Sequence, residues 1–247
     1  MHRFFLRPQQ VTSQKITFPL DLAHQILHVL RLKDGDLVEV LINDGFIMQA
    51  QLKFNVDQNI LFGKVLERSV VSTEPRVNLQ LYFGLSNREK VELILQKGTE
   101  IGVSTFCPYV SSRTIVRTTN LPEKKRVRWE RIIREAAEQS NRGKLPILRA
   151  TVDLAKGFSE SKSSANQSLI AWAQADTQND RLADIIIPQK EGVIAVFVGP
   201  EGGFSEDEIN LAKMMELQVV SLGDRILRME TAAIIFPTLV LYALGVL

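Results

Sequence analysis

From residue 77 onward, short apolar segments alternate with longer amphipathic segments, and this alternation restricts the folds open to the chain. Residues 193–198 are continuously hydrophobic and residues 77–83 and 105–110 are mostly so, as expected for strands that are buried in a sheet. The stretches between them have hydrophobic side chains at helical spacing. This part of the chain therefore predicts an α/β fold with a largely parallel sheet and helices on both faces.

The preceding part of the chain has a different pattern, with short β-type runs separated by turn-forming residues at 43–45 and 55–59. These runs occupy residues 36–42, 46–54 and 60–66. We therefore predict a small β-barrel domain over residues 1–72, followed by an α/β domain over residues 73–247.

Three local signals refine the α/β part. Ser86 and Glu89 have the spacing of a capping box at the start of a helix. Pro122 is expected to begin a long helix that runs to about residue 140. The serine-rich stretch 159–168 predicts a surface loop.

The composition is that of a globular protein, with 45% hydrophobic and 23% charged residues. No apolar run reaches the roughly 18 residues that a membrane-spanning helix requires, and the first residues do not resemble a signal peptide. We therefore expect a cytoplasmic protein with no membrane partner. His24 and His28 have a spacing that can bind zinc, but no further ligands accompany them, so no metal is predicted. The single cysteine, Cys107, is expected in the core.

The net charge of +2 conceals a strong asymmetry along the chain. Residues 73–150 carry a net charge of +7, whereas residues 151–247 carry −6 and residues 1–72 carry +1. The basic stretch indicates either a surface that binds a polyanion or a solvated helix rich in lysine and arginine.

A glycine-rich loop, Gly-Pro-Glu-Gly-Gly-Phe-Ser at 199–205, follows the predicted strand at 193–198. In open α/β sheets ligands bind at the carboxyl ends of strands, so this is a candidate binding loop. It matches neither a P-loop nor the dinucleotide fingerprint, and the acidic Glu201 would repel phosphates. Taken alone, three glycines in a turn also have a purely structural explanation. Ser205 and Glu208 form a second capping box before the next predicted helix.

A second loop, Gly-Asp-Arg-Ile-Leu-Arg-Met-Glu-Thr at 223–231, leads into an apolar helix that begins near Ala232. That helix is too apolar to be fully exposed, so it packs on the sheet or on a partner subunit. Arg225, Arg228 and Glu230 beside such an element indicate a functional site. An ion-paired cap on the last helix is the structural alternative.

Together the two loops resemble a known signature. Residues 198–205 (VGPEGGFS) and 222–232 (LGDRILRMETA) are similar to the C-terminal motifs of the ribosomal RNA small subunit methyltransferase E family, the 16S rRNA (uracil-N3)-methyltransferases of the SPOUT class. Residues 92–103, 135–146 and 28–31 also resemble this family, so the resemblance spans essentially the whole chain.

The resemblance implies a PUA-like RNA-binding barrel at 1–72 and a SPOUT methyltransferase domain at 73–247, tied in a deep trefoil knot. It also implies a homodimer, with S-adenosylmethionine as the cofactor between the glycine loops. Segment 169–174 is expected to supply a further wall. Carried over by position, the cofactor-binding residues are Val198, Gly199, Gly202, Leu222, Gly223, Ile226, Leu227 and Thr231.

The family's reaction transfers a methyl group to N3 of a specific uridine in 16S rRNA. Uracil N3 carries a proton that must leave, so the site needs a base or a group that stabilises the uracil anion. We expect Glu230 to be the base, with Arg225 or Arg228 stabilising charge on the uracil carbonyl oxygens. Alternatively, Glu230 holds these arginines in place.

The expected partner is 16S rRNA or the small ribosomal subunit, bound through phosphate contacts of the barrel and of the long helix. The candidate RNA-binding residues are Arg3, Arg7, Arg31, Gln139, Asn141 and Arg142. Two other functions stay open at this point. A related SPOUT enzyme would methylate a ribose 2′-oxygen or a tRNA, and an assembly factor would bind rRNA without catalysis.

Overall fold

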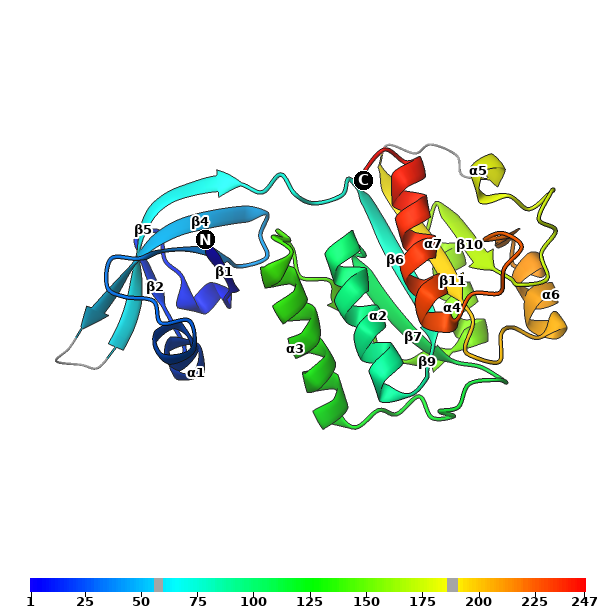
Figure 1. Ribbon diagram of the computed structural model, residues 1–247, viewed down its shortest axis with the longest axis horizontal. Helices are drawn as coiled ribbons and strands as arrows, with labels where there is room; N and C mark the ends of the chain where they lie inside the picture. The colour runs from blue at the N-terminus through cyan, green and yellow to red at the C-terminus, as the bar shows by residue number, and fades with distance from the viewer. Residues whose placement is uncertain (56–59, 186–190) are drawn as a thin grey trace. The chain divides into compact units, whose positions relative to one another are not determined.

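The computed structural model describes residues 1–55, 60–185 and 191–247, which divide into two compact units (Figure 1). The first unit comprises Met1–Glu74 and Ala137–Leu145, and the second comprises Pro75–Ala136 and Pro146–Leu247. The sequence pattern placed the boundary two residues earlier and did not indicate that a later segment joins the first unit. The turn predicted at 55–59 lies, apart from its first residue, outside the described residues.

In the described part of the first unit, five strands form one sheet in the order β1-β3-β4-β5-β2. β1 and β3 are parallel, and the other neighbours are antiparallel. Along β4, Met48, Ala50 and Leu52 are buried while the residues between them are more exposed, which is the alternation of a one-sided sheet. The elements are β1 (His2–Phe5), a 3-10 turn (Pro8–Gln10), β2 (Lys15–Thr17), α1 (Leu20–His24), a π-helical turn (Gln25–Val29), β3 (Leu37–Leu41), β4 (Phe46–Asn55) and β5 (Ile60–Val70).

In the described part of the second unit, seven strands form one sheet in which every paired neighbour is parallel. The order is β12-β10-β11-β6-β7-β8, and β9 pairs with β7. The strands are β6 (Val77–Gly84), β7 (Thr105–Val110), β8 (Ile147–Leu148), β9 (Val152–Asp153), β10 (Gln167–Ala171), β11 (Gly192–Val198) and β12 (Gln218–Val220). The helices are α2 (Arg88–Ile101), α3 (Glu123–Gln139), α4 (Leu154–Ser164), α5 (Leu182–Ile185), α6 (Glu206–Met214) and α7 (Met229–Ala243).

Helices cover both faces of this sheet. Along β6, Leu81 and Phe83 belong to a buried cluster with residues of α2 and α7, which lie side by side in Figure 1. Tyr82, between them, belongs to a second cluster on the opposite face with residues of α4 and α6. Its ring stacks on that of Phe197 of β11 at 4.2 Å between centroids. The predicted parallel α/β fold is confirmed.

The two predicted capping boxes have different outcomes. Ser205 and Glu208 form theirs at the start of α6, where each side chain accepts a hydrogen bond from the other's backbone N–H. At the start of α2 the prediction is wrong by one residue. Asn87 is the cap, and Ser86 instead donates its hydroxyl to Glu201 in the glycine-rich loop. A long-range partner therefore replaces the local one.

The serine-rich stretch, predicted as a loop, is largely helical because α4 continues to Ser164. The hydroxyls of Ser163 and Ser164 donate hydrogen bonds to the carbonyl of Glu160 at 3.0 and 2.7 Å. Both hydroxyls therefore find a hydrogen-bond partner within the helix itself. The long helix predicted from Pro122 is confirmed as α3.

Two helical glycines of the second unit should respond in opposite ways to alanine. A Cβ at Gly98 of α2 would lie 2.6 Å from Cε1 of the buried Phe106, whereas a Cβ at Gly157 of α4 would be 3.4 Å from the Tyr82 ring. We expect Gly98→Ala to lower the free energy of unfolding by about 1–3 kcal/mol because the core is overpacked.

The matched variant Gly157→Ala should leave that free energy unchanged or raise it by up to about 1 kcal/mol, since alanine favours the helix. Chemical denaturation of both variants and the wild type measures the difference. Equal destabilisation by both substitutions would contradict the close helix–sheet packing at Gly98.

Candidate functional site

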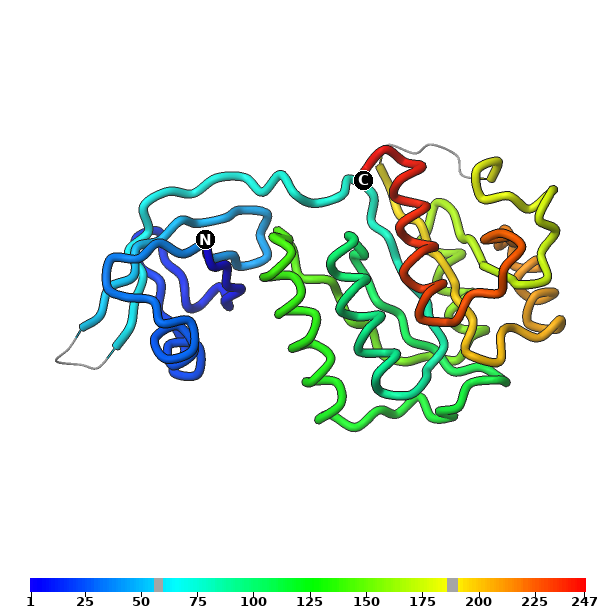
Figure 2. Tube along the Cα trace, in the orientation of Figure 1, coloured from blue at the N-terminus to red at the C-terminus, as the bar shows by residue number. Residues whose placement is uncertain are grey.

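A cavity of about 520 Å³ lies where three parallel strands of the second unit end. Its walls are the segments that follow β10, β11 and β12, and Figure 2 traces the last of these into the start of α7. The lining residues are Lys90, Arg113, Ala171, Trp172, Ala173, Gln174, Val198, Gly199, Pro200, Glu201, Gly202, Gly203, Phe204, Leu222, Gly223, Arg225, Ile226, Leu227, Arg228, Met229 and Ala232.

Seven of the eight residues predicted to bind a cofactor line this cavity. They are Val198, Gly199, Gly202, Leu222, Gly223, Ile226 and Leu227. The eighth, Thr231, is exposed in the first turn of α7, where Met229 and Ala232 face the cavity instead. The predicted extra wall at 169–174 is present through its last four residues.

The glycine-rich loop is held from two sides. Tyr109 of β7, fully buried, donates its hydroxyl to the carbonyl of Val198 at 2.8 Å, just before the loop begins. Arg113, in the segment after β7, donates from Nη1 to the carbonyls of Gly202 at 3.0 Å and Phe204 at 3.2 Å. A Cβ at Gly202 would lie only 3.0 Å from Cβ of Arg113, so a side chain at this position would crowd Arg113. The motifs alone do not indicate Tyr109 or Arg113.

Charged groups of both signs border the cavity. Lys90 Nζ lies 3.1 Å from Glu201 Oε1 and 3.7 Å from Glu230 Oε2. Burial raises the pKa of Glu201, but hydrogen bonds from Ser86 and Lys90 and the charge of Lys90 outweigh it, so the net pKa lies below its usual value. Glu201 is therefore ionised at neutral pH.

The predicted catalytic arginines, Arg225 and Arg228, both line the cavity. Glu230 is not among the lining residues, but it lies in the first turn of α7 and pairs with a lysine that is. Within the described residues, neither arginine forms an ion pair with Glu230, and Glu230 Oε2 is buried without a hydrogen-bond partner.

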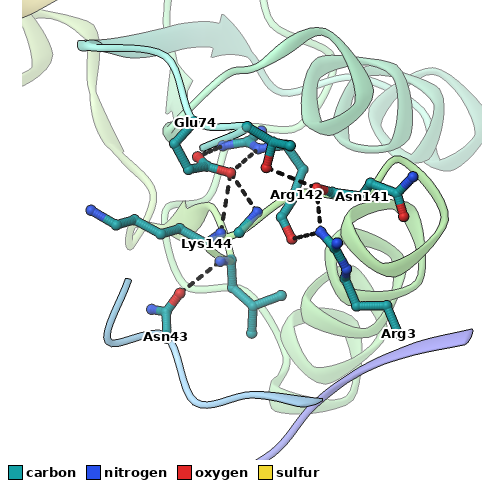
Figure 3. Close-up of polar contacts among 9 residues, drawn as sticks. Arg3, Asn43, Glu74, Asn141, Arg142 and Lys144 are labelled. Atoms are coloured by element: carbon teal, nitrogen blue, oxygen red, sulfur yellow. Dashed lines mark hydrogen bonds and ion pairs between the residues drawn. The ribbon is translucent and has the colours of Figure 1, made fainter. Parts of the chain in front are cut away.

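All six predicted RNA-binding residues lie in the first unit. Arg7, Arg31, Gln139 and Asn141 are exposed. Arg3 has a side chain that is only 9% exposed, with its guanidinium paired to Glu39 at 2.8 Å. The same guanidinium also donates to the carbonyls of Asn141 and Arg142, as Figure 3 shows.

Arg142 has a side chain that is 5% exposed and forms two hydrogen bonds with Glu74, at 3.0 and 2.9 Å (Figure 3). The carboxylate of Glu74 also accepts from the backbone N–H groups of Gly143 and Lys144. An RNA phosphate would have to replace this carboxylate in order to reach the guanidinium. In the structure, Arg142 therefore fastens the segment 137–145 within the first unit.

The remaining candidate groups take no part in the cavity. Cys107 is 2% exposed, and burial raises the pKa of its thiol to about 12, so it is a core residue as predicted. The rings of His24 and His28 lie against each other at a tilt of 43°, with 4.6 Å between their centroids. Across the described ranges, no group of three or more His, Cys, Asp or Glu side chains could hold a metal ion. No described helix combines the length and apolar character needed to cross a bilayer.

Known relatives are similar to this chain over most of its length. A model of the RNA methyltransferase domain matches residues 73–241. Ribosomal RNA small subunit methyltransferase E of Bacillus subtilis is 31% identical over 243 residues, which cover 94% of this chain and 93% of that protein. The chain belongs to this methyltransferase E family. The protein of the same name from Synechocystis is 32% identical, over 100% of this chain and 78% of its own.

Two solved structures agree with the fold. The methyltransferase E of Neisseria gonorrhoeae, bound to S-adenosylmethionine, has a TM-score of 0.84 at 28% identity and covers 98% of this chain and 97% of its own. A protein from Legionella pneumophila, in complex with the same cofactor, has a TM-score of 0.85 at 27% identity over 98% and 97% of the two chains. The family resemblance inferred from the two loops is confirmed.

The Glu74–Arg142 pair should make the stability of the protein depend on pH. Burial raises the pKa of Glu74, but Arg142 and two backbone N–H groups lower it more, so its net pKa lies below the usual value of 4.5. Between the folded pKa and about pH 4.5, the Glu74 carboxyl therefore binds more protons in the unfolded chain than in the folded one. The pair's contribution to the free energy of unfolding is present above about pH 4.5 and is lost as the pH falls through the folded pKa.

We expect Glu74→Gln to lower the free energy of unfolding by about 1–3 kcal/mol near pH 6, because it replaces charge-assisted hydrogen bonds. The difference in free energy of unfolding between variant and wild type should become smaller near pH 3.5. The control Glu135→Gln removes an exposed pair with Arg131 and should change little. Chemical denaturation at pH 6 and pH 3.5 measures the free energy of unfolding of variant and wild type. An equal difference at both pH values would contradict the link between Glu74 ionisation and stability.

Proposed function

We propose that this protein transfers a methyl group from S-adenosylmethionine to N3 of a specific uridine in the 16S rRNA of the small ribosomal subunit. The observation that carries the proposal is the cavity at the ends of β10, β11 and β12, because its two glycine loops are the motifs that the chain shares with its family. The relative from Neisseria gonorrhoeae supports the choice of cofactor, since it was solved with S-adenosylmethionine bound.

The residues around the cavity suit this cofactor. Its volume lies within the usual range of roughly 300–1,000 Å³ for small-molecule sites. Leu222, Ile226 and Leu227 offer apolar walls to an adenine ring, and the glycine loops offer backbone hydrogen-bonding groups. The ionised carboxylate of Glu201 would repel a phosphate-bearing cofactor but attract a sulfonium cation.

Bound S-adenosylmethionine supplies an electrophilic methyl group, and the chain's own residues must prepare the uracil. Glu230 is our candidate for the base that removes the N3 proton. Its Oε2 is buried without a hydrogen-bond partner in the described part of the chain, so a turn of the carboxylate toward the cavity would present a free lone pair to that proton. Arg225 and Arg228 are proposed to stabilise the charge that develops on the uracil carbonyl oxygens. N3 lies on the pairing edge, so the target uridine must be unpaired or flipped out.

The first unit is proposed to bind the rRNA: residues 1–72 are the proposed PUA-like barrel, residues 137–145 belong to the same unit, and the methyltransferase domain is proposed within residues 73–247. Its exposed Arg7, Arg31, Gln139 and Asn141 are the proposed contacts with the RNA backbone. The trefoil knot, the homodimer and a cytoplasmic location complete the proposal and are supported by the family resemblance.

Titration calorimetry of the purified protein tests the cofactor. We expect micromolar binding of S-adenosylmethionine and no comparable binding of ATP or NAD, because the cavity lacks a phosphate-binding motif and carries Glu201 at its wall. Absence of binding to the folded protein would favour the assembly factor that binds rRNA without catalysis.

Glu230→Gln tests the reaction. We expect the rate of methylation of unmodified small subunits to fall by about 10²- to 10⁴-fold, with the affinity for S-adenosylmethionine within about threefold of wild type. Mass spectrometry of the digested rRNA should identify 3-methyluridine as the wild-type product. A 2′-O-methylated nucleoside, or product in tRNA alone, would show the related activity instead.

A further inference from the structure

We propose that Lys90 is a positioning residue of the methyl-transfer site, which holds Glu230 in place by joining its carboxylate to that of Glu201. The inference rests on the proposed function for its consequence, but the contacts stand independently of it. Lys90 belongs to neither of the two glycine loops whose motifs identify the family.

The ammonium group of Lys90 joins three separate segments of the second unit. Lys90 itself lies in the first turn of α2, Glu201 lies in the loop after β11, and Glu230 lies in the first turn of α7. The side chains are 27%, 24% and 16% exposed, in that order, so the group is shielded from solvent over most of its surface. One cation therefore links both cavity loops to a helix that is part of the core.

The backbone at Lys90 is well fixed. Asn87 caps α2 by accepting a hydrogen bond from the N–H of Lys90 at 3.1 Å. The next residue, Val91, is fully buried. Ser86, 1% exposed, donates its hydroxyl to the same oxygen of Glu201 that Lys90 contacts. The start of α2 thus supplies two partners of Glu201 from a rigid base.

Lys90 Nζ interacts differently with the carboxylates of Glu201 and Glu230, as its distances to them show. At 3.1 Å, Lys90 Nζ donates a hydrogen bond to Glu201 Oε1. At 3.7 Å from Glu230 Oε2 the contact is too long for a hydrogen bond, yet the opposite charges attract. Lys90 therefore holds Glu230 by charge while leaving the lone pairs of that oxygen to accept a proton. Without the ammonium group, the two carboxylates would lose the cation that contacts both of them.

Methylation kinetics of Lys90→Met give the first test. We expect kcat to fall about 10- to 100-fold, because Glu230 is displaced from the reacting atoms, while the Kd for S-adenosylmethionine changes less than about threefold. Lys90→Arg, which keeps the charge, should recover most of kcat. Lys97→Met is the matched control, since Lys97 lies on the same helix and pairs with Glu100 at 2.9 Å away from the cavity.

A double variant tests whether Lys90 acts through Glu230. If it does, Lys90→Met should cause no further loss of kcat when Glu230 is already Gln. Multiplied losses in the double variant, or equal losses with Lys90→Met and Lys97→Met, would overturn the proposal.

Hydrogen–deuterium exchange of the cofactor-free protein gives a readout that needs no activity. Lys90→Met should speed the exchange of residues 199–205 and 223–231, while the strands of the sheet and the Lys97→Met variant exchange like the wild type. Unchanged loop exchange would overturn the proposal, and faster exchange of the strands would mean that Lys90 supports the fold in general. Failure of the proposed function is recognised separately, because the wild type would then bind no S-adenosylmethionine or form no 3-methyluridine.

Discussion

Parallel pairing of β10 with both β11 and β12 is the constraint on which the second unit depends. Leu169 of β10 lies opposite Val196 of β11 on one side and Gln218 of β12 on the other. Because all three strands run the same way, the segments that follow them emerge at one edge of the sheet and enclose one cavity. The parallel arrangement also requires helices on both faces, which provides the two hydrophobic cores.

Negative and positive side chains both border the cavity, and the proposed reaction needs the two signs for different reactants. A sulfonium cation is favoured by nearby carboxylates, whereas a uracil that loses its N3 proton is favoured by cations. In the proposed reaction, Glu201 in the cavity wall and Glu230 beside it would supply the first, and Arg225, Arg228 and Lys90 the second. Lys90 Nζ contacts both carboxylates, and in the proposed role it offsets their mutual repulsion.

The sequence was sufficient where function is carried by consecutive residues. The parallel strands follow from local patterns, and seven of the eight predicted cofactor-binding residues, carried over from the family resemblance of the two loops, line the cavity. Thr231 was misplaced because the turn of α7 that contains it presents its neighbours to the cavity. Lys90 and Arg113 could not be predicted, since each reaches the cavity from an element distant in sequence.

Residue type was also a poor guide to burial in the first unit. Arg3 and Arg142 look like RNA contacts in the sequence, but their guanidinium groups are paired inside the unit. The sequence around Arg142 does not indicate its ion-pair partner, because Glu74 precedes it by 68 residues. Only the folded structure shows that Arg142 stabilises the first unit through a buried ion pair.

The discontinuity of the first unit has a consequence for how such a protein can change over evolution. Its first stretch ends at Glu74, and its second, Ala137–Leu145, is encoded after a large part of the other unit. A single genetic crossover after codon 74 would separate Glu74 from Arg142 and would remove Ala137 from its core with Phe5 and Leu41. Because no single contiguous gene segment encodes the whole first unit, it cannot be replaced in one recombination step. The two units are therefore expected to have evolved together.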